Sequence, residues 1–326
     1  MNLRTFVYKL KTRIHRNLII NSKGKIWYYW LYDSYWHYRF FETCNDNNCI
    51  QYITARPNPG AGIGHQIANW LAGYNLASYY NLQYAIFPFS DLNSPLKANE
   101  WDVFLGLNRE EVTTEELLNS GYKKVLLPRI NFYSEDEREL LNNIIASYKG
   151  KKVVFLAEMD QYAGEELKCL EFMREKYWSA PARENDRLLF DEKKFSVAVH
   201  IRRGDIVQVG KKQNDNLTIR WLDTDYYVQK LERYLKKYAG NKEYEIYIFS
   251  QSDLEEIERF QKFENVKFCN HMNAIDSFLH MVNADMLVMS RSGMSYQAAK
   301  LNRKGIIIYP NDFWREPVED ERWVVE

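Results

Sequence analysis

Two adjacent arginines, a histidine and a carboxylate follow one short apolar segment, in the order His200-Ile201-Arg202-Arg203-Gly204-Asp205. The segment before them, residues 195–199, is mostly apolar and lacks helical spacing, which predicts a buried strand that ends where Gly204 breaks the pattern. A guanidinium is planar, permanently charged and able to donate to two phosphate oxygens at once. The run therefore predicts a site for a phosphate or a diphosphate at the end of a strand.

The same run also suits a surface salt-bridge cluster, a common use of arginine-rich turns after strands. In an extended chain the side chains of His200 and Arg202 share one direction and Arg203 takes the other. Asp205 fits two roles, either neutralising an arginine or acting as a base. Both interpretations stay open on this run alone.

A glycine-rich segment, Gly60-Ala61-Gly62-Ile63-Gly64-His65-Gln66, follows the predicted strand Tyr52–Ala55 and precedes a helical pattern over residues 67–77. This layout predicts a strand, a tight loop and a helix, with backbone N–H groups and a helix N-terminus facing a ligand. The segment lacks the Gly-Lys-Ser/Thr ending of a Walker loop and the spacing of a dinucleotide-binding loop. Glycines that only allow close helix packing are the alternative explanation.

Strand-like and helical patterns alternate through the rest of the chain. The predicted strands cover residues 124–127, 153–156, 195–201, 245–249, 266–268, 286–289 and 305–309. The predicted helices cover residues 114–118, 135–145, 225–238, 254–260, 274–281 and 296–301. Strands joined by helices indicate parallel sheets covered on both faces. The pattern therefore predicts an α/β protein with two such sheets and a cleft between two domains.

Two further polar runs come directly after predicted strands: Ser250-Gln251-Ser252-Asp253 and Ser290-Arg291-Ser292-Gly293-Met294-Ser295. Because ligands of doubly wound sheets bind beyond the carboxyl ends of the strands, these runs should meet residues 200–205 on one rim. Capping of the helix that follows accounts for one serine but not for three. The sequence predicts a phosphate held between the arginine pair and this hydroxyl-rich helix start.

The overall charge is balanced, with 44 Lys and Arg against 44 Asp and Glu, so no global field attracts nucleic acid. The four cysteines are too sparse for a disulfide scaffold or a structural zinc site, which favours a reducing compartment. No segment reaches the roughly 18 unbroken apolar residues that a membrane span requires. The partner of this protein must therefore be argued from local features.

The N-terminal segment, residues 1–50, carries the one local charge asymmetry. Basic residues from Arg4 to Arg39 face almost no acid, and two aromatic clusters lie among them, Trp27-Tyr28-Tyr29-Trp30 and Tyr35-Trp36-His37-Tyr38. Such a segment suits peripheral contact with an anionic membrane surface. A helix that docks on the body of the protein by its aromatic face explains the pattern equally well.

These motifs resemble those of the α-1,2-fucosyltransferases of glycosyltransferase family 11, which use GDP-fucose. The run from His200 to Asp205 is similar to the HxRRxD motif of that family, and the segment from Gly60 to Gln66 is similar to its GGLGNQ-type first motif. The run Ser292-Gly293-Met294-Ser295-Tyr296-Gln297-Ala298-Ala299 is similar to its SSFSWWAA block, and the tail from Tyr309 to Trp314 to its proline-aromatic ending. The resemblance extends in the same motif order over most of the chain.

The resemblance implies a GT-B-like fold of two Rossmann-like domains and an inverting, metal-independent transfer of L-fucose from GDP-fucose to a hydroxyl of a glycan. The expected division is a basic and aromatic segment (1–50), an acceptor-side α/β domain (51–190) and a GDP-sugar-binding α/β domain (191–326). No cofactor and no metal are expected. The expected acceptor is an oligosaccharide or a lipid-linked glycan of surface polysaccharide biosynthesis, at the cytoplasmic face of a membrane.

The resemblance also implies roles for residues of this chain. The expected catalytic set is Arg202, Arg203 and Asp205, with the two arginines on the donor phosphates. Asp205 is the first candidate for the base, and Asp215, Asp223 and Asp225 are alternatives. The remaining expected donor-binding residues are His200, Ser250, Ser292, Ser295 and Gln297. The expected loop on the acceptor or fucose side contains Gly60, Gly62, Gly64, His65 and Gln66.

Two departures from the family pattern bear on these roles: the chain has Ser250-Gln251-Ser252-Asp253 where the family has Ser-Asp-Asp, and His65 replaces an asparagine. Positive charge aimed at a departing diphosphate stabilises the transition state more than the ground state, which suits the arginine pair. Two other functions stay open. One is transfer from a different nucleotide sugar, and the other is glycan binding without turnover, with tyrosines and tryptophans stacking on sugars.

Overall fold

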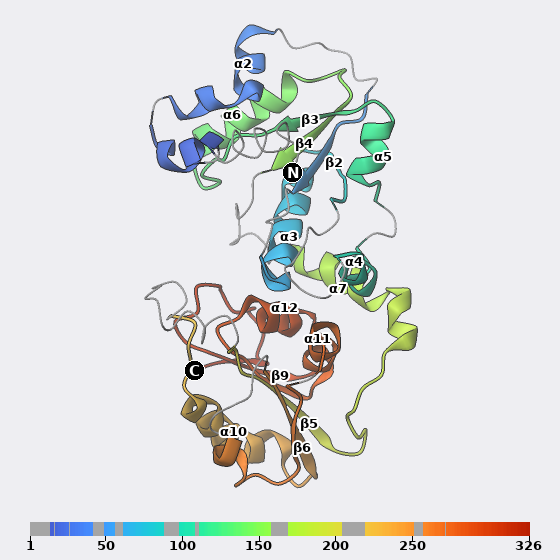
Figure 1. Cartoon of the computed structure of the whole chain (residues 1–326), viewed down its shortest axis with the longest axis vertical. Helices are drawn as coiled ribbons and strands as arrows, with labels where there is room; N and C mark the ends of the chain where they lie inside the picture. The colour runs from blue at the N-terminus through green and yellow to red at the C-terminus, as the bar shows by residue number, and fades with distance from the viewer. Residues whose placement is uncertain are drawn as a thin grey trace, which may run out of the picture. The chain divides into compact units, whose positions relative to one another are not determined.

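A computed structural model describes residues 14–15, 17–25, 27–41, 49–55, 61–87, 98–107, 111–157, 169–203, 219–250, 257–270 and 272–326 (Figure 1). The chain divides into two compact units. The first unit comprises Met1–Arg56, Ala72–Phe87 and Glu110–Tyr162, and the second comprises Pro57–Leu71, Pro88–Arg109 and Ala163–Glu326. Each unit is built on a parallel sheet with helices packed on it, so the predicted α/β class is confirmed. The expected domain boundaries at residues 50 and 190, and the cleft, stay predictions.

The sheet of the first unit has the strand order β2-β1-β4-β3 within the described residues, and all its pairs are parallel. Its strands are β1 (Tyr52–Ala55), β2 (Gln83–Tyr84), β3 (Lys123–Leu126) and β4 (Val153–Ala157). Its helices are η1 (Tyr28–Leu31), α2 (Asp33–Phe40), α5 (Thr114–Asn119), α6 (Glu135–Ala146) and the part of α3 (Ile63–Tyr79) from Ala72 onward. The central strands are fully buried at Ile53 and Val154, which explains why they read as unbroken apolar runs.

Local signals fix several helix starts of this unit. Helix α5 begins with a capping box, in which the Thr113 side chain and the Glu116 side chain each bond the other's backbone N–H. Helix α6 begins at the N-cap Ser134, whose hydroxyl accepts from the N–H of Glu137 at 3.4 Å. Capping at these positions accounts for the close match between the predicted and observed starts of both helices.

The N-terminal segment packs onto the first unit. Tyr28 and Tyr32 are buried in a cluster that includes Ile19 and packs against Leu126 of β3. The hydroxyl of Ser34 donates to the carbonyl oxygen of Leu126 at 2.7 Å. Of the two interpretations that the sequence left open, docking of the N-terminal segment on the body of the protein is therefore present. Contact of this segment with a membrane stays a prediction.

The sheet of the second unit has the order β10-β9-β8-β5-β6-β7, again with parallel pairs throughout the described part. Its strands are β5 (Phe195–His200), β6 (Tyr244–Phe249), β7 (Val266–Phe268), β8 (Met286–Val288), β9 (Ile306–Tyr309) and β10 (Trp323–Val325). Its helices are α4 (Ala98–Leu105), α7 (Leu170–Trp178), η3 (Pro181–Asn185), α10 (Thr224–Ala239), η4 (Ile257–Phe260), α11 (Ala274–Asn283) and α12 (Gly293–Leu301), with the first part of α3.

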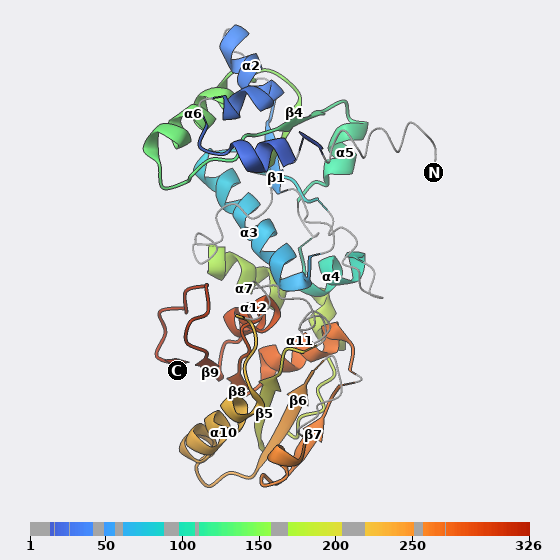
Figure 2. The same cartoon turned by 60° about the vertical axis from the view of Figure 1, so that its left-hand side comes forward.

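Helices α10 and α11 flank this sheet (Figure 2). Tyr227 and Leu231 of α10 are fully buried against Val197 and Val199 of β5. On the other face, His280 of α11 contacts the ring of Phe249 with centroids 5.8 Å apart. Because successive side chains of a strand point to opposite faces, the strand ends lie between two helical layers.

Most predicted elements of the second unit are confirmed, with several differences. Helices α4 and α7 and the turn η3 were not predicted, and α12 begins at Gly293 rather than at Tyr296. Of the predicted helix over residues 254–260, the described part, Ile257–Phe260, forms the short 3₁₀ turn η4, and residues 251–256 lie outside the described part. Strand β10 was not predicted, because three residues at the end of the chain carry no periodic signal.

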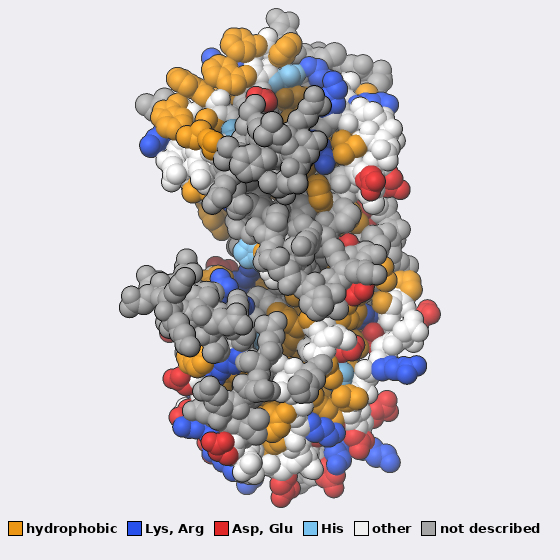
Figure 3. Space-filling model, in the orientation of Figure 1, with side chains coloured by type: hydrophobic (Ala, Val, Ile, Leu, Met, Phe, Trp, Pro, Cys, Tyr) orange, Lys and Arg blue, Asp and Glu red, His pale blue; other side chains and the backbone are white. Residues whose placement is uncertain are grey.

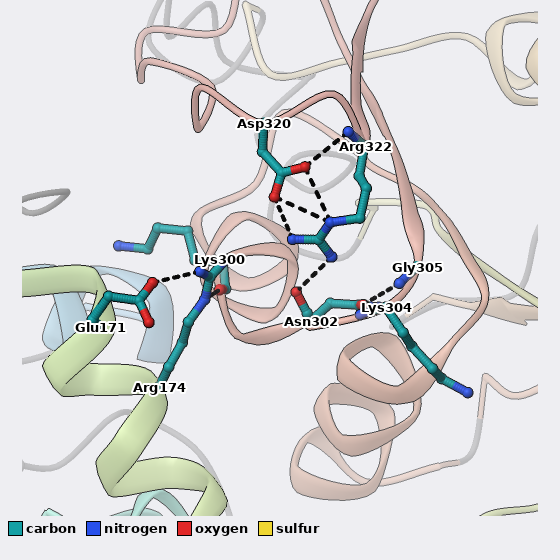
Figure 4. Close-up of polar contacts among 8 residues, drawn as sticks. All are labelled: Glu171, Arg174, Lys300, Asn302, Lys304, Gly305, Asp320 and Arg322. Carbon is teal, nitrogen blue, oxygen red and sulfur yellow. Dashed lines mark hydrogen bonds and ion pairs between the residues drawn. The ribbon is translucent and has the colours of Figure 1, made fainter.

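A polar network fastens α12 to α7 and to the C-terminal segment of the second unit (Figure 4). The Nε–H of Arg174 donates to the carbonyl oxygen of Lys300 at 2.7 Å. The side-chain oxygen of Asn302 accepts from the N–H groups of Lys304 and Gly305, at 3.0 and 2.6 Å. Arg322 donates to the Asn302 carbonyl oxygen at 3.2 Å. These bonds hold α12 in a defined position.

Among the described helices, none is long and apolar enough for a membrane span.

Candidate functional site

The polar runs predicted to follow strands meet at one edge of the second sheet. Strands β5, β6 and β8 are parallel neighbours, with His200 in register with Phe249 and Val199 in register with Val288. Their carboxyl ends therefore lie along the same edge. The described residues that follow these ends are Ile201 to Arg203, Ser250, and the run from Met289 into α12.

His200 is buried at the end of β5, with 7% of its surface exposed. Burial, and next the charge of Arg202, lower its pKa to about 3, so the imidazole is neutral at pH 7. Its Nδ1 atom is buried and has no hydrogen-bond partner among the described residues, and the same holds for the hydroxyl of Ser250. Buried polar atoms of this kind are rare unless a ligand, water or ion completes them. The ends of two adjacent strands therefore offer polar atoms to a bound molecule.

The backbone of Arg202 is tied to the end of β8. Its N–H donates to the hydroxyl oxygen of Ser290 at 3.4 Å, and that oxygen also accepts from the hydroxyl of Tyr227 at 3.0 Å. Tyr227 is fully buried, and burial raises its pKa to about 12, so it stays a hydrogen-bond donor. The side chain of Arg202 is half-buried beside His200. A permanent positive charge is thus held at the sheet edge by a fixed backbone.

Arg203 points toward the start of α10 and is 6% exposed. Its Nη1 donates to the carbonyl oxygens of Arg202 and Leu222, at 3.0 and 3.1 Å, and its Nη2 donates to the hydroxyl of Thr224 at 3.3 Å. Its guanidinium carbon lies 3.9 Å from the ring centroid of Trp221. In this structure Arg203 therefore fixes the strand end to the start of α10. Contact between Arg203 and a phosphate stays a prediction.

The serines at the start of α12 are buried and bonded within the unit. Ser292 is the N-cap and accepts from the N–H of Met294 at 3.3 Å. The hydroxyl of Ser295 donates to the carbonyl oxygens of Ser290 and Ser292, at 3.2 and 3.3 Å. These bonds stabilise the turn between β8 and α12, and donor binding by Ser292 and Ser295 stays a prediction.

Helix α3 begins at Ile63, so the predicted loop through Gln66 is wrong: Gly64, His65 and Gln66 lie in the first turn of the helix. The reason is packing rather than loop conformation. A Cβ on Gly64 would lie 2.1 Å from the carbonyl carbon of Gly293 at the start of α12. The two helix N-termini therefore meet within the second unit because one of them lacks a side chain.

Other residues of the glycine-rich segment have different surroundings. A Cβ on Gly62 would meet no atom within 4 Å, and Gly60 lies outside the described residues. The side-chain amide of Gln297, which is 1% exposed, donates to the carbonyl oxygen of Gly64 at 3.4 Å. Gln297 therefore joins the two helix starts. The N-terminal ends of α3 and α12 each carry the positive pole of a helix, which favours the binding of an anion.

The candidate bases fall into two groups. Asp205 and Asp215 lie outside the described residues. Asp223 accepts from the indole N–H of Trp221 at 2.7 Å, and Asp225 forms an ion pair with Arg259. No group of three or more His, Cys, Asp or Glu side chains that could hold a metal ion occurs in the described ranges.

Two residues of this edge, Tyr227 and Trp221, were not predicted from the sequence, whereas Arg291 lies in the predicted run from Ser290 to Ser295. Tyr227 and Trp221 hold Ser290 and Arg203, as described above. Arg291 donates from Nε and Nη2 to the carbonyl oxygen of Asn311, at 3.1 and 2.9 Å, and from Nη1 to that of Ile219 at 3.1 Å. Tyr227 and Trp221 act on residues distant in sequence, so no local motif indicates them.

Comparisons with known proteins support the resemblance of the sequence motifs to glycosyltransferase family 11. The model of glycosyl transferase family 11 matches residues 133–322, which contain the run from His200 to Arg203 and the start of α12 but not the glycine-rich segment. No curated protein matches the chain.

Several solved structures resemble the chain at low identity. A structure of POFUT1 in complex with GDP-fucose is 13% identical, with 81% of this chain and 98% of that chain covered and a TM-score of 0.49. NodZ alpha-1,6-fucosyltransferase soaked with GDP-fucose is 12% identical, with 81% and 95% covered and a TM-score of 0.48. The fucosyltransferase NodZ from Bradyrhizobium is 13% identical, with 79% and 95% covered and a TM-score of 0.46.

The family model spans more than half of the chain and includes the described residues at the edge of the second sheet, from His200 to Arg203 and at the start of α12. The chain belongs to glycosyl transferase family 11, the fucosyltransferase family that its motifs resemble.

Proposed function

We propose that this family 11 transferase moves L-fucose from GDP-fucose to a hydroxyl of a glycan acceptor, with inversion and without a metal ion, and forms an α-1,2 linkage. The acceptor is an oligosaccharide or a lipid-linked glycan of surface polysaccharide biosynthesis, and the enzyme acts at the cytoplasmic face of a membrane. The donor follows from the motif resemblance and from family membership.

One observation carries the proposal: a cationic side chain, buried polar atoms without partners among the described residues, and helix N-termini meet at one sheet edge. Arg202 supplies the charge, and the Nδ1 of His200 and the hydroxyl of Ser250 supply polar atoms that lack partners among the described residues. The starts of α3 and α12 lie against each other at Gly64 and Gly293. This combination suits a diphosphate, which is anionic and rich in acceptor oxygens.

The proposed chemistry assigns a role to each of these groups. When the bond between fucose and the β-phosphate breaks, negative charge grows on the phosphate oxygen. In this proposal Arg202 and the positive helix poles stabilise that charge, so they bind the transition state more tightly than the ground state. Arg203 holds Arg202 and the start of α10 in position through its bonds to the carbonyl oxygens of Arg202 and Leu222. To contact a phosphate directly, Arg203 would have to give up these bonds when the donor binds.

Attack by the acceptor hydroxyl from the opposite face of the sugar produces inversion. A carboxylate base assists by taking the hydroxyl proton. We assign this role to Asp205, the carboxylate of the motif that resembles the family, whereas Asp223 and Asp225 bond Trp221 and Arg259. Asp205→Asn should lower turnover strongly and remove the acidic limb of the pH profile of kcat, which is the fall in rate as the base becomes protonated. An unchanged profile would move the base to another residue.

A donor screen tests the proposed function. Purified protein is incubated with GDP-fucose, GDP-mannose and a uridine diphosphate sugar, each with a panel of galactose-terminated acceptors and with or without EDTA. We expect transfer from GDP-fucose alone, an α-1,2 linkage in the product, and the same rate with the chelator. Transfer from another donor, or a rate abolished by EDTA and restored by a divalent cation, would contradict the proposal. Tight GDP binding without transfer to any acceptor would favour glycan binding without turnover.

A further inference from the structure

Four aromatic side chains of the first unit form an exposed surface, which we call the aromatic face: Trp30, Trp36, Phe40 and Phe41. Their exposed fractions are 53%, 38%, 74% and 59%. Trp36 stacks on Phe40 with ring centroids 5.7 Å apart, and Trp30 lies 6.1 Å from Trp36. Figure 3 shows hydrophobic side chains gathered in this region, over α2. A contiguous apolar surface of this kind commonly marks an interaction site.

The orientation of this face is fixed by the packing behind it. Tyr28 and Tyr32, from the same segment, are 3% and 1% exposed and their hydroxyls lie 2.9 Å apart. The indole N–H of Trp36 donates to the carbonyl oxygen of Trp30 at 2.9 Å, which holds the two exposed rings together. The aromatic face is therefore presented outward by a packed layer and is not an unpacked part of the core.

The segment that carries this face is basic in its amino-acid sequence. Residues 1–41 contain eight Lys and Arg residues against the single acid Asp33. Among the described residues, the ammonium of Lys151 lies 5.0 Å from the ring centroid of Phe41, and that of Lys25 lies 5.4 Å from that of Trp27. A basic group thus lies directly beside Phe41, one of the exposed rings, whereas Trp27 is partly buried and is not part of the aromatic face.

We propose that the aromatic face binds the surface of an anionic lipid bilayer. Tryptophan and phenylalanine rings insert at the boundary between headgroups and acyl chains, and lysine and arginine side chains pair with anionic headgroups. The charge complementarity selects this partner over a second copy of the chain, because two copies of so basic a segment repel each other. The proposal does not depend on the identity of the donor sugar.

Vesicle sedimentation with the full chain tests this proposal. One set of vesicles contains phosphatidylcholine alone, and the other contains roughly one third phosphatidylglycerol. The variants are Phe40→Ser and, as a matched control, Tyr133→Ser. Tyr133 is an aromatic residue of the same unit with 76% exposure, but it is followed by the acidic start of α6. Circular dichroism melting checks that each variant folds.

We expect the wild type to sediment with the anionic vesicles and much less with the neutral ones. Phe40→Ser should lower the partition coefficient roughly fivefold, whereas Tyr133→Ser should leave it unchanged. Added salt should weaken binding, because it screens the charges. Failure of the wild type to bind anionic vesicles would overturn the proposal. So would an equal loss in Tyr133→Ser, or a dimer in lipid-free buffer that Phe40→Ser dissociates.

Discussion

The imidazole of His200, at the edge of the second sheet, is neutral at pH 7 because burial disfavours its charged form. Its folded pKa of about 3 lies below the ordinary value of 6.5, with burial as the main cause. Below pH 6.5 the unfolded chain binds a proton that the folded chain does not. The free energy of unfolding should therefore fall on acidification from pH 6.5 toward pH 3, by up to roughly 1.4 kcal/mol per pH unit from this group.

Denaturant unfolding at a series of pH values checks this prediction. His200→Asn removes the titrating ring, so its stability should depend less on pH in this window than that of the wild type. His280, whose pKa is also lowered by burial, provides a background slope that both proteins share. Parallel pH profiles for the two proteins would contradict the neutral, buried state of His200.

Arg202 and Arg203 are adjacent in sequence but have different surroundings, and substitution should separate them. Arg203→Lys keeps the charge but loses the bonds to Leu222 and Thr224 and the stacking on Trp221, so we expect about 2 kcal/mol less stability. Arg202→Lys should leave the unfolding midpoint nearly unchanged. Equal midpoints for Arg203→Lys and the wild type would contradict the positioning role of Arg203.

At the residue scale, the sequence identified the charged motif but not the partners of its members. Alternation along the strand predicted that Arg203 points away from His200, and the structure agrees. Trp221 and Thr224, which hold Arg203, lie about one helix-length further along the chain and carry no motif of their own. Contacts between residues distant in sequence depend on the tertiary structure, so local sequence patterns do not reveal them.

At the scale of the elements, the contact between the starts of α3 and α12 depends on one glycine. Gly64→Ala places a Cβ 2.1 Å from the backbone of Gly293, so the helices must move apart. We expect about 2 kcal/mol of destabilisation. Gly293→Ala is the matched control, because its Cβ would meet Gly64 at 3.5 Å, an ordinary contact distance.

Thermal melting of both variants measures this difference. Gly64→Ala should melt several degrees below Gly293→Ala, and the latter should stay close to the wild type. Equal melting temperatures would show that the two helix starts do not pack as described.

Strands were the most predictable elements, because β1, β4, β5, β6 and β8 are buried apolar runs bounded by polar residues. The start of α3 was predicted at the wrong residue because it depends on a contact with a distant segment rather than on local sequence. Glycines at positions 62 and 64 are typical of loops, and only the approach of α12 explains a glycine inside the first helical turn. A helix boundary set by a distant segment cannot be predicted from local sequence.

At the scale of the whole molecule, every described residue expected to bind the donor belongs to the second unit. The part of α3 that carries Gly64 and His65, which were expected on the acceptor or fucose side, belongs to it as well. The aromatic face belongs to the first unit. Donor binding and membrane binding should therefore respond to different substitutions. Phe40→Ser should leave the affinity for GDP unchanged, and Arg202→Lys should leave the partition onto anionic vesicles unchanged.

The central claim, that Arg202 grips the donor diphosphate, is tested most directly by calorimetric titration with GDP and with guanosine. Arg202→Lys should weaken GDP binding roughly tenfold to a hundredfold, since it loses a charge-assisted bidentate contact, while guanosine binding stays the same. Arg303→Lys, which changes an exposed arginine of the same unit, should bind both ligands like the wild type. Unchanged GDP affinity in Arg202→Lys, or an equal loss for GDP and guanosine, would contradict the account.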